Sequence, residues 1–84
     1  MLTLKEQRAL ASRLLGLSEE ETEKYGAIIE DDHALYISVP EKGGASLIVG
    51  QDGEVRYADS SVGYSRHIAE YKRGTRTPID AFSN

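Results

Sequence analysis

The chain has 84 residues, no cysteine and a formal net charge of −4 at pH 7. This length fits one domain, residues 1–84, with a modest hydrophobic core. Disulfides and cysteine-ligated metal sites are excluded, and the absence of cysteine favours the cytoplasm. Residues 2–17 carry too many charges for a signal peptide or a membrane span, so we expect a cytoplasmic protein.

Two capping boxes predict a pair of helices at the start of the chain. Thr3 and Glu6 form the first box, and Ser18 and Glu21 form the second. Leucines recur at helical spacing between the two boxes, and Gly16 can end the first helix in the left-handed conformation. The second helix is expected to end at about residue 25.

The middle of the chain predicts strands. Residues 34–39 alternate between apolar and polar side chains, and residues 27–30 could form a strand before them. The Asp52-Gly53 pair lies between two β-prone runs, residues 46–49 and 55–58, which indicates a hairpin. These connections are too short for parallel crossovers, so we expect an antiparallel meander of three or four strands.

A further helix is predicted after the hairpin. Tyr64, Ile68 and Tyr71 recur at helical spacing, so one side of this helix should pack on the sheet. Ser60 or Ser61 is the expected N-cap residue. The predicted fold class is therefore α+β, with an N-terminal helical hairpin, an antiparallel meander and a C-terminal helix packed on the sheet.

No pattern in the chain indicates catalysis, a metal or a cofactor. His33 and His67 are the two histidines, and neither stands in a metal-binding spacing. Ser60 and Ser61 precede His67, but the glycine-flanked turn that exposes a catalytic serine is missing. We expect His67 to flank the apolar stripe of its helix, and we expect a protein that is not an enzyme.

Charge is distributed unevenly along the chain. Residues 1–42 hold five Lys or Arg against nine Asp or Glu, whereas residues 43–84 hold five of each. This balance argues against nucleic-acid binding and favours either plain solubility or a basic protein partner. The candidate partner-binding residues are Glu19, Glu20, Glu23, Glu30, Asp31, Asp32, Tyr36 and Tyr57.

The grouping of the two tyrosines in that set depends on which face of the sheet each one occupies. Tyr36 and Tyr57 would group with Tyr64 if they share one sheet face. Tyrosine is enriched at protein interfaces, yet a core tyrosine with a satisfied hydroxyl fits this composition equally well.

A second candidate site would bind a small anion. Hydroxyls at a helix start and basic residues behind them can hold a phosphate or carboxylate. The candidates are Ser60, Ser61, Arg66, Arg73 and Arg76. In the simpler interpretation, a serine caps the helix and the arginines face solvent.

Residues 43–77, GGASLIVGQDGEVRYADSSVGYSRHIAEYKRGTRT, carry a family resemblance. A hairpin with an Asp-Gly turn, a short helix and a basic glycine-containing loop resemble small bacterial immunity proteins of polymorphic-toxin systems. The resemblance covers somewhat under half of the chain. It implies a non-catalytic cytoplasmic inhibitor that covers the active surface of a cognate toxin.

The expected function is therefore a protein-binding module, such as an immunity or antitoxin-like inhibitor. Three alternatives stay open: a small-ligand or anion-binding domain, a phage or mobile-element inhibitor of a host protein, and a homo-oligomer that pairs sheet edges. We expect neither nucleic-acid nor membrane partners, and the sequence does not determine the oligomeric state.

Overall fold

The computed structural model describes residues 1–40 and 43–82. Its elements are α1 (Leu4–Leu15), α2 (Glu19–Tyr25), β1 (Gly26–Ile29), β2 (Ala34–Val39), β3 (Ala45–Val49), β4 (Val55–Ala58), α3 (Tyr64–Lys72) and the 3-10 helix η2 (Ile79–Phe82). The strands form one antiparallel sheet in the order β1-β2-β3-β4. The predicted α+β class and meander are confirmed, and the strand expected near residues 27–30 does join the sheet.

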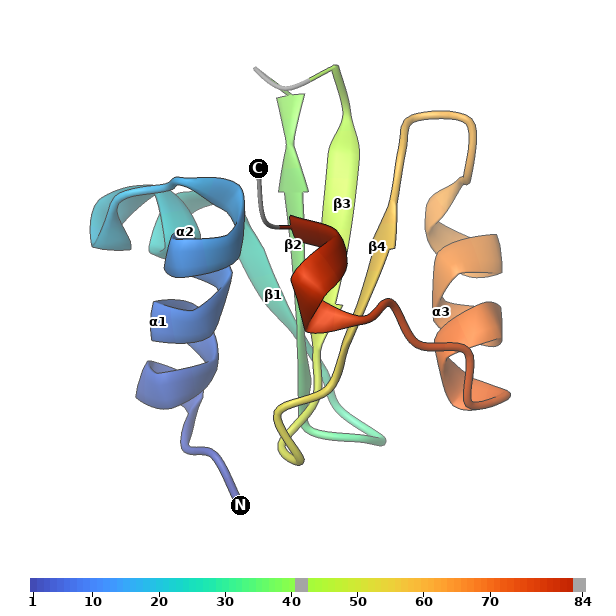
Figure 1. Ribbon diagram of the computed structural model, residues 1–84, viewed down its shortest axis with the longest axis horizontal. Coiled ribbons are helices and arrows are strands. Elements are labelled where there is room, and N and C mark those ends of the chain that lie inside the picture. Colours follow the sequence, from blue (N-terminus) through green and yellow to red (C-terminus); the bar gives the residue numbers. More distant parts are fainter. Residues whose placement is uncertain (41–42, 83–84) are drawn as a thin grey trace.

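The helices cover both faces of the sheet. The pair α1 and α2 lies on one side, which we call the α1 face, and α3 lies on the other, the α3 face (Figure 1). Alternation along the strands explains this arrangement, because successive side chains point to opposite faces. Leu35 and Ile37 pack in the core under α1, whereas Ile48 packs with Tyr71 under α3.

Local capping signals define the N-terminal helices. Glu6 Oε1 accepts a hydrogen bond from the Thr3 backbone N–H at 2.8 Å, and Glu21 Oε1 accepts one from the Ser18 N–H at 2.9 Å. Gly16 follows α1 with φ +69°. Both capping boxes and the left-handed C-cap are confirmed.

The start of α3 differs from the prediction. Gly63 is its N-cap residue and makes no side-chain capping bond, so the expectation that Ser60 or Ser61 caps this helix is wrong. Asp59 is the reason, because its carboxylate accepts hydrogen bonds from both the N–H and the hydroxyl of Ser61. In the resulting turn the Val62 N–H donates to Asp59 O, and α3 begins only after this turn, at Tyr64.

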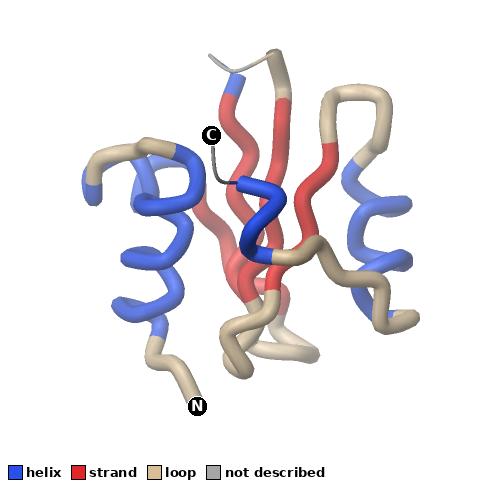
Figure 2. The backbone as a smooth tube through the Cα atoms, in the orientation of Figure 1, coloured by secondary structure: helices blue, strands red, loops and turns tan. Residues whose placement is uncertain are grey.

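The two edge strands of the sheet, β4 and β1, differ in whether another segment covers them. The segment before η2 crosses near one end of β4 (Figure 2), where the Thr77 N–H donates to Val55 O at 2.7 Å. The Thr77 hydroxyl oxygen also accepts a hydrogen bond from the Tyr57 N–H at 2.8 Å. At the opposite edge, the outer side of β1 has no such covering segment within residues 1–40 and 43–82.

Candidate functional site

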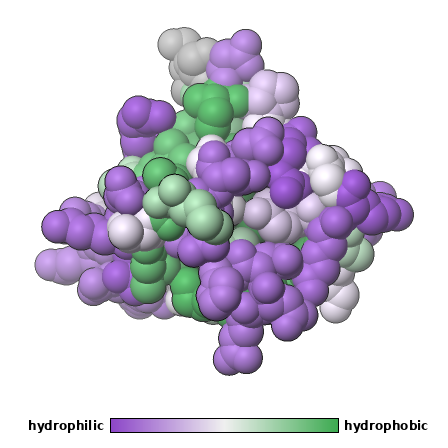
Figure 3. Space-filling model, turned by 90° about the horizontal axis from the view of Figure 1, so that it is seen from below, coloured by the Kyte–Doolittle hydropathy of each residue, from purple (hydrophilic) through white to green (hydrophobic). Residues whose placement is uncertain are grey.

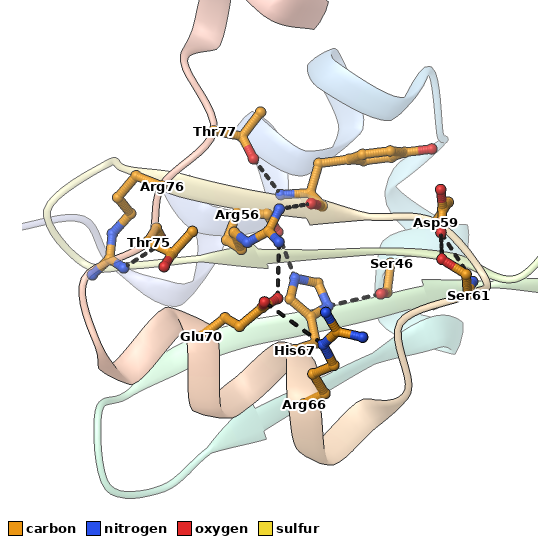
Figure 4. A network of polar contacts seen from close by, with 11 residues as sticks. Ser46, Arg56, Asp59, Ser61, Arg66, His67, Glu70, Thr75, Arg76 and Thr77 are labelled. Atoms are coloured by element: carbon orange, nitrogen blue, oxygen red, sulfur yellow. Dashed lines mark hydrogen bonds and ion pairs between the residues drawn. The ribbon is translucent and has the colours of Figure 1, made fainter.

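A buried polar network joins α3 to the sheet. His67 is 0% exposed, with Nδ1 2.8 Å from Ser46 Oγ and Nε2 2.8 Å from the backbone oxygen of Arg56 (Figure 4). A carbonyl oxygen can only accept, so Nε2 carries the proton and Nδ1 accepts from the Ser46 hydroxyl. His67 is therefore held as one neutral tautomer between β3 and β4.

This serine–histidine pair lacks what a nucleophilic site needs. Ser46 is 2% exposed and His67 is fully buried, so a substrate has no access to either. Nucleophilic catalysis requires a serine that can reach the reacting atom as well as a base beside it. The pair fixes the position of α3. The expectation that His67 only flanks an apolar stripe of Tyr64, Ile68 and Tyr71 is wrong, because His67 is 0% exposed whereas Tyr64 is 56% exposed.

An ion pair extends the network to the edge of the sheet. Arg56 Nη2 lies 2.9 Å from Glu70 Oε1, and Arg66 Nε lies 3.7 Å from Glu70 Oε2. The hydrogen bond from Arg56 lowers the pKa of the Glu70 carboxyl below its ordinary value. The Arg56 side chain also donates to the Tyr57 backbone oxygen. These contacts place Arg56 between α3 and β4.

Because His67 is buried in this network, we expect the free energy of unfolding to decrease as the pH falls. Burial lowers the pKa of His67, and the nearby Arg56 charge acts in the same direction. The unfolded chain then binds a proton more readily than the folded chain, so stability is present above about pH 6.5 and is lost as the pH falls through the folded-state value. Urea unfolding between about pH 7.5 and about pH 5 should therefore show a falling free energy.

The control for that pH dependence uses the other histidine. His33 is exposed in the turn between β1 and β2 at φ +51°, a conformation that asparagine also tolerates. His33→Asn should keep the slope, whereas His67→Gln should flatten it above the range where carboxylates titrate. An unchanged slope in His67→Gln would refute the assignment.

The five residues of the predicted anion site are not brought together. Ser60 and Ser61 precede α3, whereas Arg73 is its C-cap residue, so the nine residues of the helix, about 14 Å, lie between them. Arg76 lies over the Tyr71 ring at 3.9 Å and donates to the Tyr71 backbone oxygen at 2.7 Å. Arg66 is engaged with Glu70. The geometry does not favour one anion site.

The predicted acidic residues form two groups. Glu19, Glu20 and Glu23 lie on α2, which leads directly into β1. Glu30, Asp31 and Asp32 lie in the turn that follows β1. The four residues of β1 span about 13 Å, so the two groups stand at opposite ends of this edge strand.

Ion pairs neutralise part of each group. Glu23 lies 3.7 Å from Arg8, and Lys72 lies 3.2 Å from Asp31 and 3.9 Å from Asp32. Glu19 and Lys5 both line a hollow of about 170 Å³ between α1 and α2. Within the described ranges, Glu20 and Glu30 are exposed and form no ion pair. Glu19 is likewise exposed and has no ion pair among the described residues, so Glu19, Glu20 and Glu30 are the available carboxylates of the set.

The assumption that Tyr36 and Tyr57 share a sheet face is wrong. Strand register places Tyr36 beside Ile48 on the α3 face and Tyr57 beside Leu47 on the α1 face. Tyr57 packs edge-to-face against Phe82 there. Tyr36 instead meets Tyr64, with ring centroids 4.8 Å apart. A shift of one position along a neighbouring strand reverses the face, so this outcome depended on register.

Gln7 is a buried polar residue that the sequence interpretation missed. Its amide nitrogen donates to His33 O at 3.0 Å and to Val49 O at 2.9 Å, which ties α1 to two strand ends. Its position in the sequence could have revealed its burial, because Gln7 is on the same side of α1 as the apolar residues Leu4 and Ala11. Ser46, inside an otherwise apolar strand, carried a similar signal.

The end of the molecule where the chain begins is mainly hydrophilic (Figure 3). A second hollow, of about 250 Å³, is lined among others by Asp32, Asp52, Lys72 and Arg76. Acidic and basic groups balance in this hollow, so it favours no class of ligand. Residues 1–40 and 43–82 contain no group of three metal-ligating side chains placed to hold an ion.

Comparisons with known protein families, curated protein sequences and solved structures find no match. None of the helices in the described part of the chain has the length and apolar character that crossing a bilayer requires. The function proposed below therefore rests on the residues and contacts of this chain.

Proposed function

We propose that this chain is a non-catalytic protein-binding module, an inhibitor of the immunity or antitoxin kind that covers a basic surface of its partner. The observation that carries the proposal is the pair of exposed carboxylates, Glu20 and Glu30, that form no ion pair within the described residues. Glu20 lies in the first turn of α2, the helix that leads into β1, and Glu30 directly follows the other end of β1.

Electrostatics explains how such a surface would act. Complementary charge accelerates the encounter of two proteins and orients them, while rim charges add less to the final affinity. A surface that normally holds nucleic acid is basic, and a small acidic protein can occupy it. The burial of the Ser46–His67 pair supports the same proposal, because it leaves that pair without access to a substrate. Such an inhibitor would act in the cytoplasm, where a cysteine-free chain needs no disulfide.

A matched pair of charge reversals tests the proposal. Glu20 in α2 and Glu54 in the hairpin loop are both exposed, and replacing either with lysine changes the net charge equally. The wild-type chain is first used to capture its partner from cells that encode it. We then expect Glu20→Lys to slow association with that partner several-fold at low salt, whereas Glu54→Lys should change it little.

Salt and partner identity complete this test. The advantage of the wild type over Glu20→Lys should shrink as ionic strength rises, because salt screens exposed charges. Equal association rates for the two variants would contradict the proposal. A toxin as the captured partner would indicate an immunity protein, and a host enzyme would indicate an inhibitor from a phage or mobile element.

A further inference from the structure

The outer side of β1 is the open edge of the sheet. Thr77 covers the β4 edge with two hydrogen bonds, but no backbone bond reaches the outer side of Gly26–Ile29 within the described ranges. An uncovered edge strand presents backbone donors and acceptors that another extended chain can pair with. The fold therefore offers one edge for strand addition, beside the acidic groups described above.

Apolar side chains lie on both faces beside this edge. Ile28 is 43% exposed on the α1 face. On the α3 face, Ala27 is exposed and pairs with Tyr36, which contacts the 56% exposed Tyr64. A strand that joins β1 could place alternate side chains against Ile28 on one face and against Ala27 and Tyr64 on the other.

Charge determines which occupant fits. Beyond one end of β1 lies α2, which carries four glutamates against one lysine, Lys24, and beyond the other end lies Glu30, so a partner with basic ends is favoured. A second copy paired antiparallel would bring the acidic α2 of each copy towards the acidic turn of the other. Like charges in such contacts are unfavourable, which argues against self-pairing.

We propose that β1 binds an extended segment of the partner as a fifth strand, through backbone pairing along Gly26–Ile29, apolar contacts at Ile28 and Tyr64, and basic residues that meet the acidic groups at both ends. This inference rests on the proposed function and specifies how the partner is bound. Strand addition supplies affinity through main-chain hydrogen bonds and selectivity through alternate side chains.

A synthetic peptide tests the binding mode without the natural partner. Its centre alternates valine and threonine, and each end carries arginines; a second peptide carries glutamates at the ends instead. Amide hydrogen exchange of β1, followed by NMR, is the measurement. We expect the arginine-ended peptide to slow exchange of outward β1 amides by at least about tenfold at saturation. The glutamate-ended peptide should not bind.

Two isoleucines provide matched variants for the same experiment. Ile28 is 43% exposed at the β1 edge, and Ile79 is 42% exposed in η2, which follows the segment that pairs with the opposite edge strand, β4. Ile28→Lys should weaken binding of the arginine-ended peptide by about tenfold or more, whereas Ile79→Lys should leave it unchanged. Circular dichroism establishes that both variants are folded.

Three outcomes would overturn the inference. Peptide binding could leave β1 exchange unchanged, both peptides could bind equally, or the protein alone could self-associate with protection of the same amides, which would make a second copy the occupant. If strand addition fails while Glu20→Lys still slows association with the partner, the proposed function stands with another binding mode. If the two lysine variants at Glu20 and Glu54 behave alike, the proposed function itself fails.

Discussion

Replacing His67 with leucine should lower the free energy of unfolding by about 2–4 kcal/mol, because a buried polar group left without a partner costs about 1–3 kcal/mol. Leucine fills much of the ring's volume but makes no hydrogen bond. The Ser46 hydroxyl and the Arg56 carbonyl then lose the partners they have at 2.8 Å in the buried network. Urea unfolding followed by circular dichroism measures the loss.

A double variant separates unpaired polar groups from altered packing. In His67→Leu/Ser46→Ala, the serine hydroxyl is removed along with its partner, so part of the lost stability should return. Ser46→Ala alone should also destabilise, since it leaves His67 Nδ1 without its donor. If His67→Leu were as stable as the wild type, the network would contribute nothing to the fold, and this account of His67 would be wrong.

Replacing Gly26 with alanine should cost about 1–3 kcal/mol, the usual range for forcing extra atoms into a packed site. Gly26 has an ordinary negative φ of −92°, so backbone strain is not the cause. A Cβ at this position would lie 2.4 Å from the Thr22 backbone oxygen and 3.2 Å from a methyl carbon of Leu35. The helix oxygen cannot move aside without disturbing the last turn of α2.

Gly63 offers the matched control, because a Cβ there would meet nothing within 4 Å and its φ is −69°. Gly63→Ala should change the free energy of unfolding by at most about 0.5 kcal/mol, through its position as N-cap residue. The comparison of urea midpoints tests how closely α2 packs where it turns into β1. Equal midpoints for the two variants would contradict that close approach.

The close packing around Gly26 also affects the position of the candidate partner-binding residues. The glycine joins α2 to β1 without an intervening loop, so it holds the α2 carboxylates at one end of the open edge. A displaced α2 should therefore weaken partner association as well as stability. The two effects can be distinguished by comparison with His67→Leu, which destabilises the fold from the opposite face of the sheet.

Local sequence signals predicted most of the elements, and the physical reason is that their causes lie within a few residues. Thr3 and Glu6 satisfy each other's backbone N–H groups, so that helix start can be recognised without the rest of the chain. The Asp52-Gly53 turn likewise needs only a glycine at φ +83° and an aspartate that accepts from the Glu54 N–H. Alternation in residues 34–39 identified the two faces of β2 in the same way.

The amino-acid sequence by itself thus determined an α+β chain with two capped helices, an antiparallel meander and an acidic first half. Tertiary structure alone decided that Tyr36 and Tyr57 lie on opposite faces, that Ser46 meets His67, and that Thr77 covers one edge while β1 stays open. These outcomes depend on strand register and on contacts between distant segments. Local propensity cannot encode them, because a register shift of one residue reverses every face.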